Sequence, residues 1–120
     1  MLNESLEKIV QNTPGAAGAI LMGFDGIAVM QYVSPDHADV DIESTAMEFS
    51  FRYVELRQAA ESLDMGEVTD ITIKADNRSV CCRVLSEEYF VAIVLADSSH
   101  IGKGRWMLRS TSGELQSELL

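Results

Sequence analysis

The sequence is poor in the residues from which most metal centres and enzyme sites are built. Its 120 residues include two histidines, two cysteines, two prolines and one tryptophan. No run approaches the roughly 20 apolar residues that a membrane-spanning helix needs. The N-terminal segment MLNESLEKIV carries acidic residues where a signal peptide would be basic. We therefore expect a cytoplasmic protein that does not span a membrane.

Positive charge is also scarce. Nine Lys and Arg residues stand against nineteen Asp and Glu residues, which gives a formal net charge of −10. Such a charge repels phosphate backbones and anionic lipid head groups, and no run of Lys and Arg interrupts it. Nucleic-acid binding and membrane binding are therefore not expected. Because 47% of the residues are hydrophobic, the chain can build one core, and residues 1–120 are predicted to form a single domain.

The few cysteines and histidines are poorly arranged for redox or metal chemistry. Cys81 and Cys82 are neighbours in a β-like run. Successive side chains of a strand point to opposite faces, so the two thiols cannot readily bridge each other or share a metal ion. His37 and His100 are far apart in the sequence and have no ligand-like spacing. We expect reduced cysteines, no metal and no cofactor.

One short segment contains the residue types of a catalytic triad. Residues 97–100 read DSSH, but three neighbouring residues cannot align a nucleophile, a base and an orienting carboxylate, because triads converge from separate parts of a chain. A turn that caps a following helix explains the same residues. Residues 102–104, GKG, lack the glycine spacing of a phosphate-binding loop. The sequence thus predicts a binding domain rather than an enzyme.

Hydrophobic periodicity predicts the order helix, two strands, long helix, three strands, helix. The expected helices cover about residues 2–12, 41–63 and 100–119, with Asn3, Asp39 or Asp41, and Ser98 or Ser99 as their N-caps. The expected strands cover residues 17–22, 27–33, 68–75, 79–85 and 89–96. Asp25 and Gly26 suit a tight hairpin turn between the first two strands. The run YFVAIVLA does not alternate and is predicted to be a central strand buried on both faces. The fold class is α+β, a five-stranded antiparallel sheet flanked by helices.

The long helix has two apolar faces. One stripe is expected to pack on the sheet, and its members are Ile42, Ala46, Phe49, Tyr53, Leu56, Ala60 and Leu63. A second face lies about 100° or more around the axis and consists of Met47, Phe51 and Val54, extended by Gln58. One sheet cannot cover both faces, so either a loop or the sheet edge covers the second one, or a partner does. We favour a homodimer, in which burial of the three apolar side chains contributes roughly 5 kcal/mol before association costs.

The order and spacing of these elements resemble a known family. The segment TPGAAGAILMGFDGIAV after the first helix, the long helix, the three-strand meander and the segment VLADSSHIGKGRWMLR are similar to the short bacterial and archaeal form of the roadblock/dynein light-chain family. One departure is His100, where members commonly place Asn before an apolar-Gly pair. The resemblance implies a roadblock/longin/profilin-like architecture over nearly the whole chain.

The resemblance also implies an interface between two copies of the chain. The edge strands of the two copies pair into one sheet, and the two long helices lie together on one face. In this sequence the edge strand is residues 68–75. The dimer interface is then expected to contain Met47, Phe51, Val54, Gln58, Ile71 and Ile73.

The resemblance further implies a partner, because bacterial dimers of this type act on small Ras-like GTPases in cell-polarity and motility systems. We therefore hypothesise a non-catalytic regulator that positions the switch segments of such a GTPase, acting as a GTPase-activating protein or as a platform. The expected contact residues are Glu43, Ser50, Arg52, Arg57 and Glu61. An arginine finger supplied by Arg52 or Arg57 is the less favoured form of this hypothesis.

Two other functions stay open from the sequence. A structural dimerisation scaffold would use the same surfaces without altering nucleotide turnover. A small-molecule sensor would bind its ligand between the sheet and a helix, a common kind of site. An enzyme is the last alternative, because the sequence offers no convincing set of catalytic groups.

Overall fold

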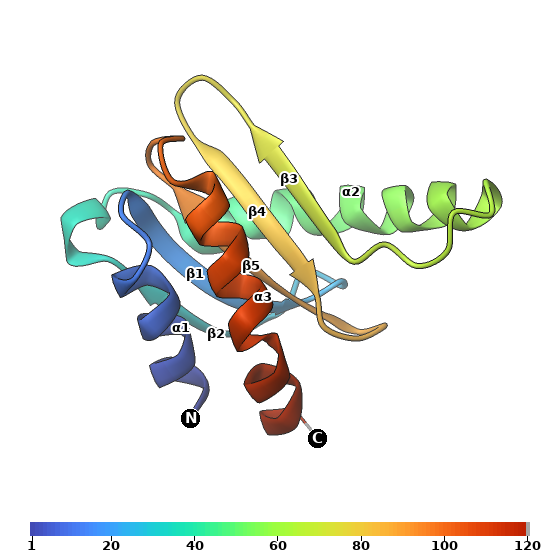
Figure 1. Cartoon of the computed structure of the whole chain (residues 1–120), viewed down its shortest axis with the longest axis horizontal. Helices are drawn as coiled ribbons and strands as arrows, with labels where there is room; N and C mark the ends of the chain where they lie inside the picture. The colour runs from blue at the N-terminus through green and yellow to red at the C-terminus, as the bar shows by residue number, and fades with distance from the viewer. Residues whose placement is uncertain (120) are drawn as a thin grey trace.

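The computed structural model describes residues 1–119 and has the predicted element order (Figure 1). Its helices are α1 (Leu2–Gln11), α2 (Ile42–Ser62) and α3 (Ile101–Glu118), with a short 3-10 helix, η1, at Pro35–His37. Its strands are β1 (Ala16–Gly23), β2 (Ala28–Val33), β3 (Asp70–Lys74), β4 (Ser79–Val84) and β5 (Tyr89–Leu95). The predicted α+β class and the three-strand meander are confirmed.

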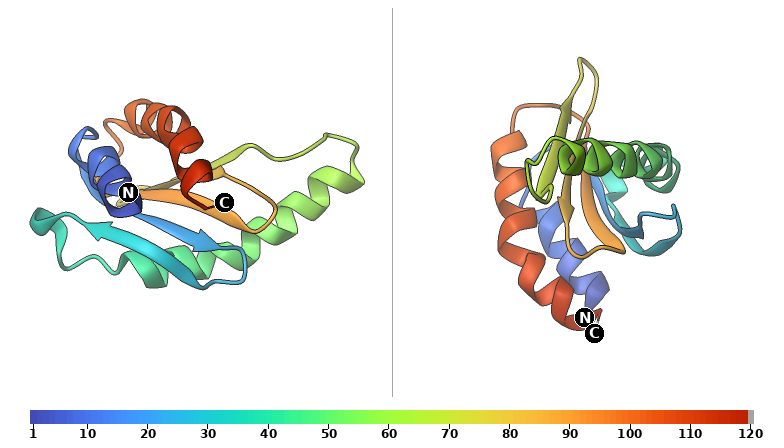
Figure 2. Two further views of the ribbon diagram at one scale, coloured as in Figure 1. Left: turned by 90° about the horizontal axis from the view of Figure 1, so that it is seen from below. Right: turned by 90° about the vertical axis from the view of Figure 1, so that its right-hand side faces the viewer.

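All five strands are antiparallel, and their spatial order is β2-β1-β5-β4-β3. The last strand in the chain, β5, therefore lies in the centre, and residues 90–95 are buried, which confirms the prediction for YFVAIVLA. The two edges of the sheet are β2 and β3. Helix α2 covers one face, while α1 and α3 lie side by side on the other (Figure 2).

The sheet separates two hydrophobic cores. The core on the side of α1 and α3 includes Leu6, Ile93 and Leu108, and the core on the side of α2 includes Ile20 and Tyr53. Strand alternation distributes neighbouring residues between the cores. The expectation for the two cysteines is confirmed, since one thiol lies in each core: Cys81 in the first and Cys82 in the second.

The helix starts are only partly as predicted. Asp41 caps α2, because its Oδ1 accepts a hydrogen bond of 3.0 Å from the backbone N–H of Ser44. The expectation that Asn3 caps α1 is wrong, since α1 already begins at Leu2 and no side chain caps it. The contacts of α1 with β1, β2 and α3 hold this helix in place without a cap.

Glycine at position 18 allows α2 to approach the sheet, and alanine there should destabilise the fold. A Cβ atom on Gly18 would lie 2.7 Å from Ile42 Cγ1 and 2.8 Å from the Tyr32 carbonyl oxygen. We expect Gly18→Ala to lower the free energy of unfolding by about 1–3 kcal/mol through overpacking. Gly113→Ala is the control: it meets nothing within 4 Å inside α3, and it should raise stability by up to about 1 kcal/mol. Urea unfolding at one protein concentration measures both, and equal losses would contradict the packing argument.

Candidate functional site: the two flanks of helix α2

Helix α2 is only partly covered by the sheet. It crosses one face obliquely, and its C-terminal part extends beyond the strands (Figures 1 and 2). Four members of the predicted stripe are buried: Ile42, Ala46, Tyr53 and Ala60. Phe49 is half-buried, whereas Leu56 is 48% exposed and Leu63 is 70% exposed. The prediction that Leu56 and Leu63 pack on the sheet is wrong, because this end of the helix has no strand beneath it.

One flank of α2 faces the turn between β1 and β2. A Cβ atom on Gly26 in this turn would lie 3.3 Å from Met47 Cγ and 3.4 Å from Phe51 Cζ. Met47 and Phe51 are 44% and 51% exposed, and Ile27, the residue after Gly26, is 67% exposed. We call this surface the hairpin flank; its residues on α2 are Glu43, Met47, Phe51, Val54, Gln58 and Glu61.

The opposite flank of α2 faces β3. Phe49, about 200° around the helix from Met47, lines an open groove of about 500 Å³ together with Ile73, Val80 and Val94. The residues of this β3 flank alternate in steps of four and three, the spacing of two helices that pack side by side. They are Thr45, Phe49, Arg52, Leu56, Ala59 and Leu63.

The structure does not bring the six predicted interface residues together. Met47, Phe51, Val54 and Gln58 lie on the hairpin flank, whereas Ile71 and Ile73 lie on the edge strand beyond the other flank. The spacing of the β3 flank is visible in the sequence. Three of its members, Phe49, Leu56 and Leu63, also belong to the stripe that is expected to pack on the sheet. The sequence could not reveal on which side of α2 the strand β3 lies.

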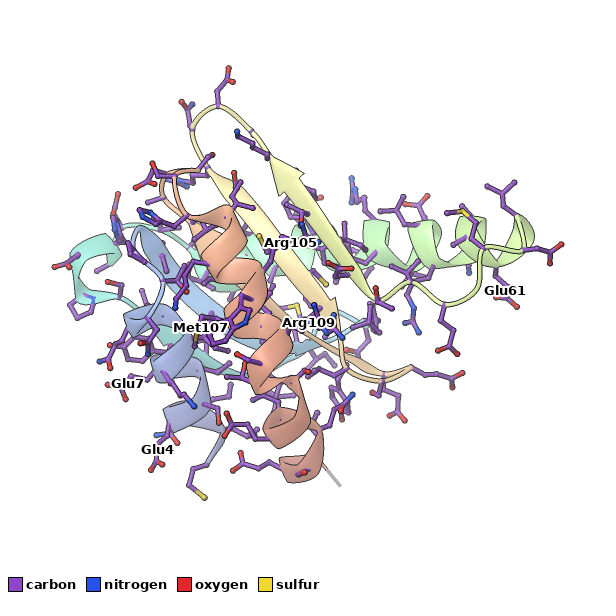
Figure 3. All side chains as sticks on the ribbon, in the orientation of Figure 1. Glu4, Glu7, Glu61, Arg105, Met107 and Arg109 are labelled. Atoms are coloured by element: carbon purple, nitrogen blue, oxygen red, sulfur yellow. The ribbon has the colours of Figure 1, made fainter. Side chains whose placement is uncertain are left out.

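The predicted partner contacts differ in how exposed they are. Glu43 and Glu61 are exposed, and Glu61 lies near the overhanging end of α2 (Figure 3). Ser50 is fully buried, and its hydroxyl donates a hydrogen bond of 2.7 Å to the Met47 carbonyl oxygen. Ser50 is therefore corrected from a surface contact to a residue of the interior.

The two arginines of α2 have different surroundings. Arg57 is half-buried; it donates a 3.0 Å hydrogen bond to the Glu87 carbonyl oxygen, and its guanidinium lies 4.2 Å from the centre of the Phe24 ring. It thereby ties α2 to the β1–β2 and β4–β5 turns. Arg52 is exposed on the β3 flank and forms a 3.0 Å ion pair with Glu48. These contacts favour a structural role for Arg57.

A buried tyrosine fills the space between α2 and the sheet. The Tyr53 ring packs edge-on against Phe90, with 5.2 Å between ring centres, and stacks on Phe49 at 6.0 Å. Among the described residues its hydroxyl has no hydrogen-bond partner. Burial, followed by the neighbouring thiol of Cys82, raises the pKa of Tyr53. Aromatic rings thus occupy the region where a sensor would hold a small ligand.

The segment 97–100 forms the turn before α3. Ser98 Oγ lies 2.9 Å from Ser79 Oγ, and Asp97 Oδ1 accepts a 3.0 Å hydrogen bond from the Ser99 backbone N–H. The hydrogen bonds from Ser99 lower the pKa of Asp97. The expectation that Ser98 or Ser99 caps α3 is wrong: the residue before the helix is His100, and its side chain makes no capping bond.

Within residues 1–119, no group of three or more His, Cys, Asp and Glu side chains is placed to hold a metal ion. In the same part of the chain, none of the helices combines the length and the apolar character needed to cross a membrane.

The arrangement defines an α+β domain in which one long helix keeps apolar side chains exposed on both flanks. The family of the domain follows from a solved structure. The chain is 31% identical to MglC from Myxococcus xanthus, over 96% of each chain, with a TM-score of 0.69. The chain belongs to the roadblock/dynein light-chain family, also called roadblock/LC7.

More distant structures share the fold. The Roadblock/LC7 domain from Streptomyces avermitilis is 18% identical over 98% of this chain and 96% of that chain, with a TM-score of 0.81. The gliding protein MglB from Thermus thermophilus is 16% identical over 95% of this chain and 84% of that chain, with a TM-score of 0.84. No protein-family model matches the chain, and no curated protein sequence matches it either.

Removal of the unpartnered hydroxyl should not cost stability. We expect Tyr53→Phe to leave the free energy of unfolding unchanged or to raise it by up to about 2 kcal/mol, because a buried hydroxyl without a hydrogen bond is unfavourable. Phe90→Leu, which removes the ring partner, should lower it by about 1 kcal/mol or more. Thermal unfolding of both variants tests this, and a loss of more than about 1 kcal/mol in Tyr53→Phe would show that the hydroxyl has a partner in solution.

Proposed function

We propose that the protein is a homodimeric regulator of a small Ras-like GTPase that acts by contact. The observation that carries the proposal is that α2 exposes apolar side chains on two opposite flanks, more than one sheet can cover. The chain belongs to the roadblock family, and bacterial dimers of this family are partners of such GTPases. This membership supports the assignment of one flank to a second copy and of the other flank to the GTPase.

The β3 flank is the better candidate for the contact between copies. If two β3 edges pair, the two α2 helices can meet only through the flank that faces β3. This flank has heptad-like spacing, with exposed Leu56 and Leu63 at its overhanging end, and Ile71 and Ile73 lie half-buried on the adjacent strand. The proposed dimer interface therefore keeps the two isoleucines expected from the sequence and combines them with the β3 flank.

The hairpin flank is then free to contact the GTPase. Met47 and Phe51 form its apolar centre, and Glu43 and Glu61 lie at its two ends along α2. An apolar centre with a charged rim is the usual composition of an interface between proteins that also exist apart. The partner surface should thus offer an apolar patch with basic residues around it. Contact there would hold the switch segments in the arrangement that aligns the attacking water.

Matched substitutions separate the two flanks. Leu56→Lys lies on the β3 flank and Met47→Lys on the hairpin flank, and the two side chains are similarly exposed. We expect Leu56→Lys to weaken the dimer about a hundredfold or more, since each interface loses two apolar side chains and gains two like charges. Met47→Lys should leave the dimer intact. Sedimentation equilibrium measures both; a monomeric wild-type protein, or a dimer disrupted only by Met47→Lys, would contradict the assignment.

The same proteins test the action on the GTPase. With the Ras-like GTPase that co-purifies from the native cell, single-turnover GTP hydrolysis should be stimulated by the wild-type protein and not by Met47→Lys. Arg52→Ala and Arg57→Ala should each change the rate less than about tenfold, whereas removal of an arginine finger costs about a thousandfold or more. Tight binding with unchanged hydrolysis would instead indicate the structural scaffold.

A further inference from the structure

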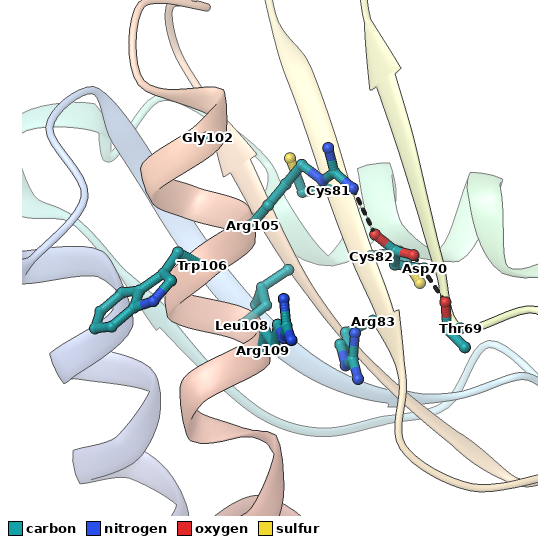
Figure 4. Close-up of a pocket in the computed structure, with 10 residues that line it drawn as sticks. All are labelled: Thr69, Asp70, Cys81, Cys82, Arg83, Gly102, Arg105, Trp106, Leu108 and Arg109. Atoms are coloured by element: carbon teal, nitrogen blue, oxygen red, sulfur yellow. Dashed lines mark hydrogen bonds and ion pairs between the residues drawn. The ribbon is translucent and has the colours of Figure 1, made fainter.

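A second kind of surface lies on the other face of the sheet. An open groove of about 540 Å³ runs between α3 and the β3–β4 edge (Figure 4). Three arginines line it, Arg83 from β4 and Arg105 and Arg109 from α3, together with Asp70 and Trp106. This groove contains no residue of α2.

Strand register and helix periodicity bring these side chains together. Asp70 and Arg83 are direct partners in the β3–β4 ladder, so both point to the face that carries α3. Arg105 and Arg109 are one helical turn apart on α3 and lie on its side toward β4 (Figure 3). The sequence already places Arg105 and Arg109 close to Lys103 in a segment without acidic residues, but only the fold adds Arg83 to them.

The groove has more positive charge than its own carboxylate can balance. Asp70 Oδ2 accepts a 3.0 Å hydrogen bond from Arg105, and this bond holds the pKa of Asp70 below its usual range. Arg83 and Arg109 form no ion pair and no side-chain hydrogen bond with any residue in 1–119. Like charges one turn apart on a helix repel each other, so the groove favours an anion.

An exposed aromatic residue, Trp106, lies at the rim of the groove, with its ring on the side of α3 away from Arg83 (Figure 4). Trp106 is 56% exposed, and Lys103 Nζ lies 4.8 Å from the centre of its ring. Tryptophan and arginine are among the residues most enriched at the energetic centres of protein interfaces. The groove thus offers cations that suit carboxylates, and an exposed aromatic ring lies beside it.

We propose that this groove binds an acidic peptide segment of a partner protein. Carboxylates of the segment would pair with Arg83 and Arg109, whose planar guanidinium groups match a carboxylate with two hydrogen bonds. A long polyanion is disfavoured because the whole chain carries a net charge of −10, whereas a short segment interacts mainly with the groove itself. Since α2 covers the opposite face, this partner and the one on α2 can bind at the same time.

Trp106 is the only tryptophan in the chain and lies between Arg105 and Arg109 in the sequence, so its fluorescence reports on the part of α3 that borders the groove. The probe is a short synthetic peptide of alternating Glu and Ala, and the matched peptide has Gln in place of each Glu. We expect the Glu peptide to change Trp106 emission in a saturable way that weakens with added salt. Equal binding of the Gln peptide, or no change with either, would overturn the proposal.

Paired variants test which arginines are responsible. R83Q/R109Q should raise the apparent Kd of the Glu peptide about tenfold or more. K8Q/R78Q removes the same number of charges outside the groove and should leave the Kd within about twofold. R83K/R109K keeps the charges and should bind better than R83Q/R109Q, which separates lost charge from a damaged fold. Equal effects of R83Q/R109Q and K8Q/R78Q would contradict the site.

Other anions give distinguishable outcomes. Inorganic phosphate at the peptide's own concentration should not displace the peptide, and full displacement would show a small-anion site instead. Vesicles of anionic phospholipid should leave Trp106 emission unchanged, and a response to vesicles without a response to the peptide would overturn the proposal. Peptide binding that requires Met47, tested with Met47→Lys, would place the contact on α2 and also contradict the groove.

Discussion

The difference in size between one long helix and one narrow sheet determines which residues of the helix are buried and which are exposed. Helix α2 has 21 residues and is therefore about 30 Å long. The five antiparallel strands form a sheet only about 20 Å wide perpendicular to their length. The residues of α2 that face the strands, such as Ile42, Ala46 and Tyr53, are buried, and Ala60 near the C-terminal end is buried as well. The exposed apolar side chains on the two flanks either stay in water or are covered by another protein.

The burial of α2 follows from this geometry. Ile42, Ala46 and Tyr53 contact the strands and belong to a core with Phe90, while Leu56 is also strongly hydrophobic but has no strand beneath it. Hydrophobic side chains on the overhang do not contribute to the fold of one copy. They are available for association with another protein, which is why the exposed apolar surface of this helix is informative about function.

Much of the fold could be predicted because it depends on local patterns. The alternation of strand residues, the run YFVAIVLA and the cap at Asp41 are each set by neighbouring residues, and each is confirmed. The assignment of Leu56 to the core and of Ser50 to the surface failed. Helical periodicity gives the angle between two residues, but it does not give the length over which a sheet lies beneath the helix or the side on which its edge strand runs.

The basic groove was missed for a related reason. Arg83 belongs to β4, and Arg105 and Arg109 belong to α3, so only the packing of α3 on the sheet brings them together. A chain with nineteen acidic and nine basic residues is acidic on average, although residues 98–113 contain Lys103, Arg105 and Arg109 and no Asp or Glu. In three dimensions the same residues form an acidic molecule with a local basic surface. The charge that a partner needs therefore differs from one surface of the molecule to another.

The bond from Arg57 to the Glu87 carbonyl oxygen has a mechanical consequence. It joins the middle of α2 to the turn that connects β4 and β5, and the stacking of Arg57 on Phe24 adds the turn between β1 and β2. A protein that pushes α2 sideways must either break this connection or carry both turns with it. The positions of these two turns are therefore coupled to that of α2 through the single side chain of Arg57.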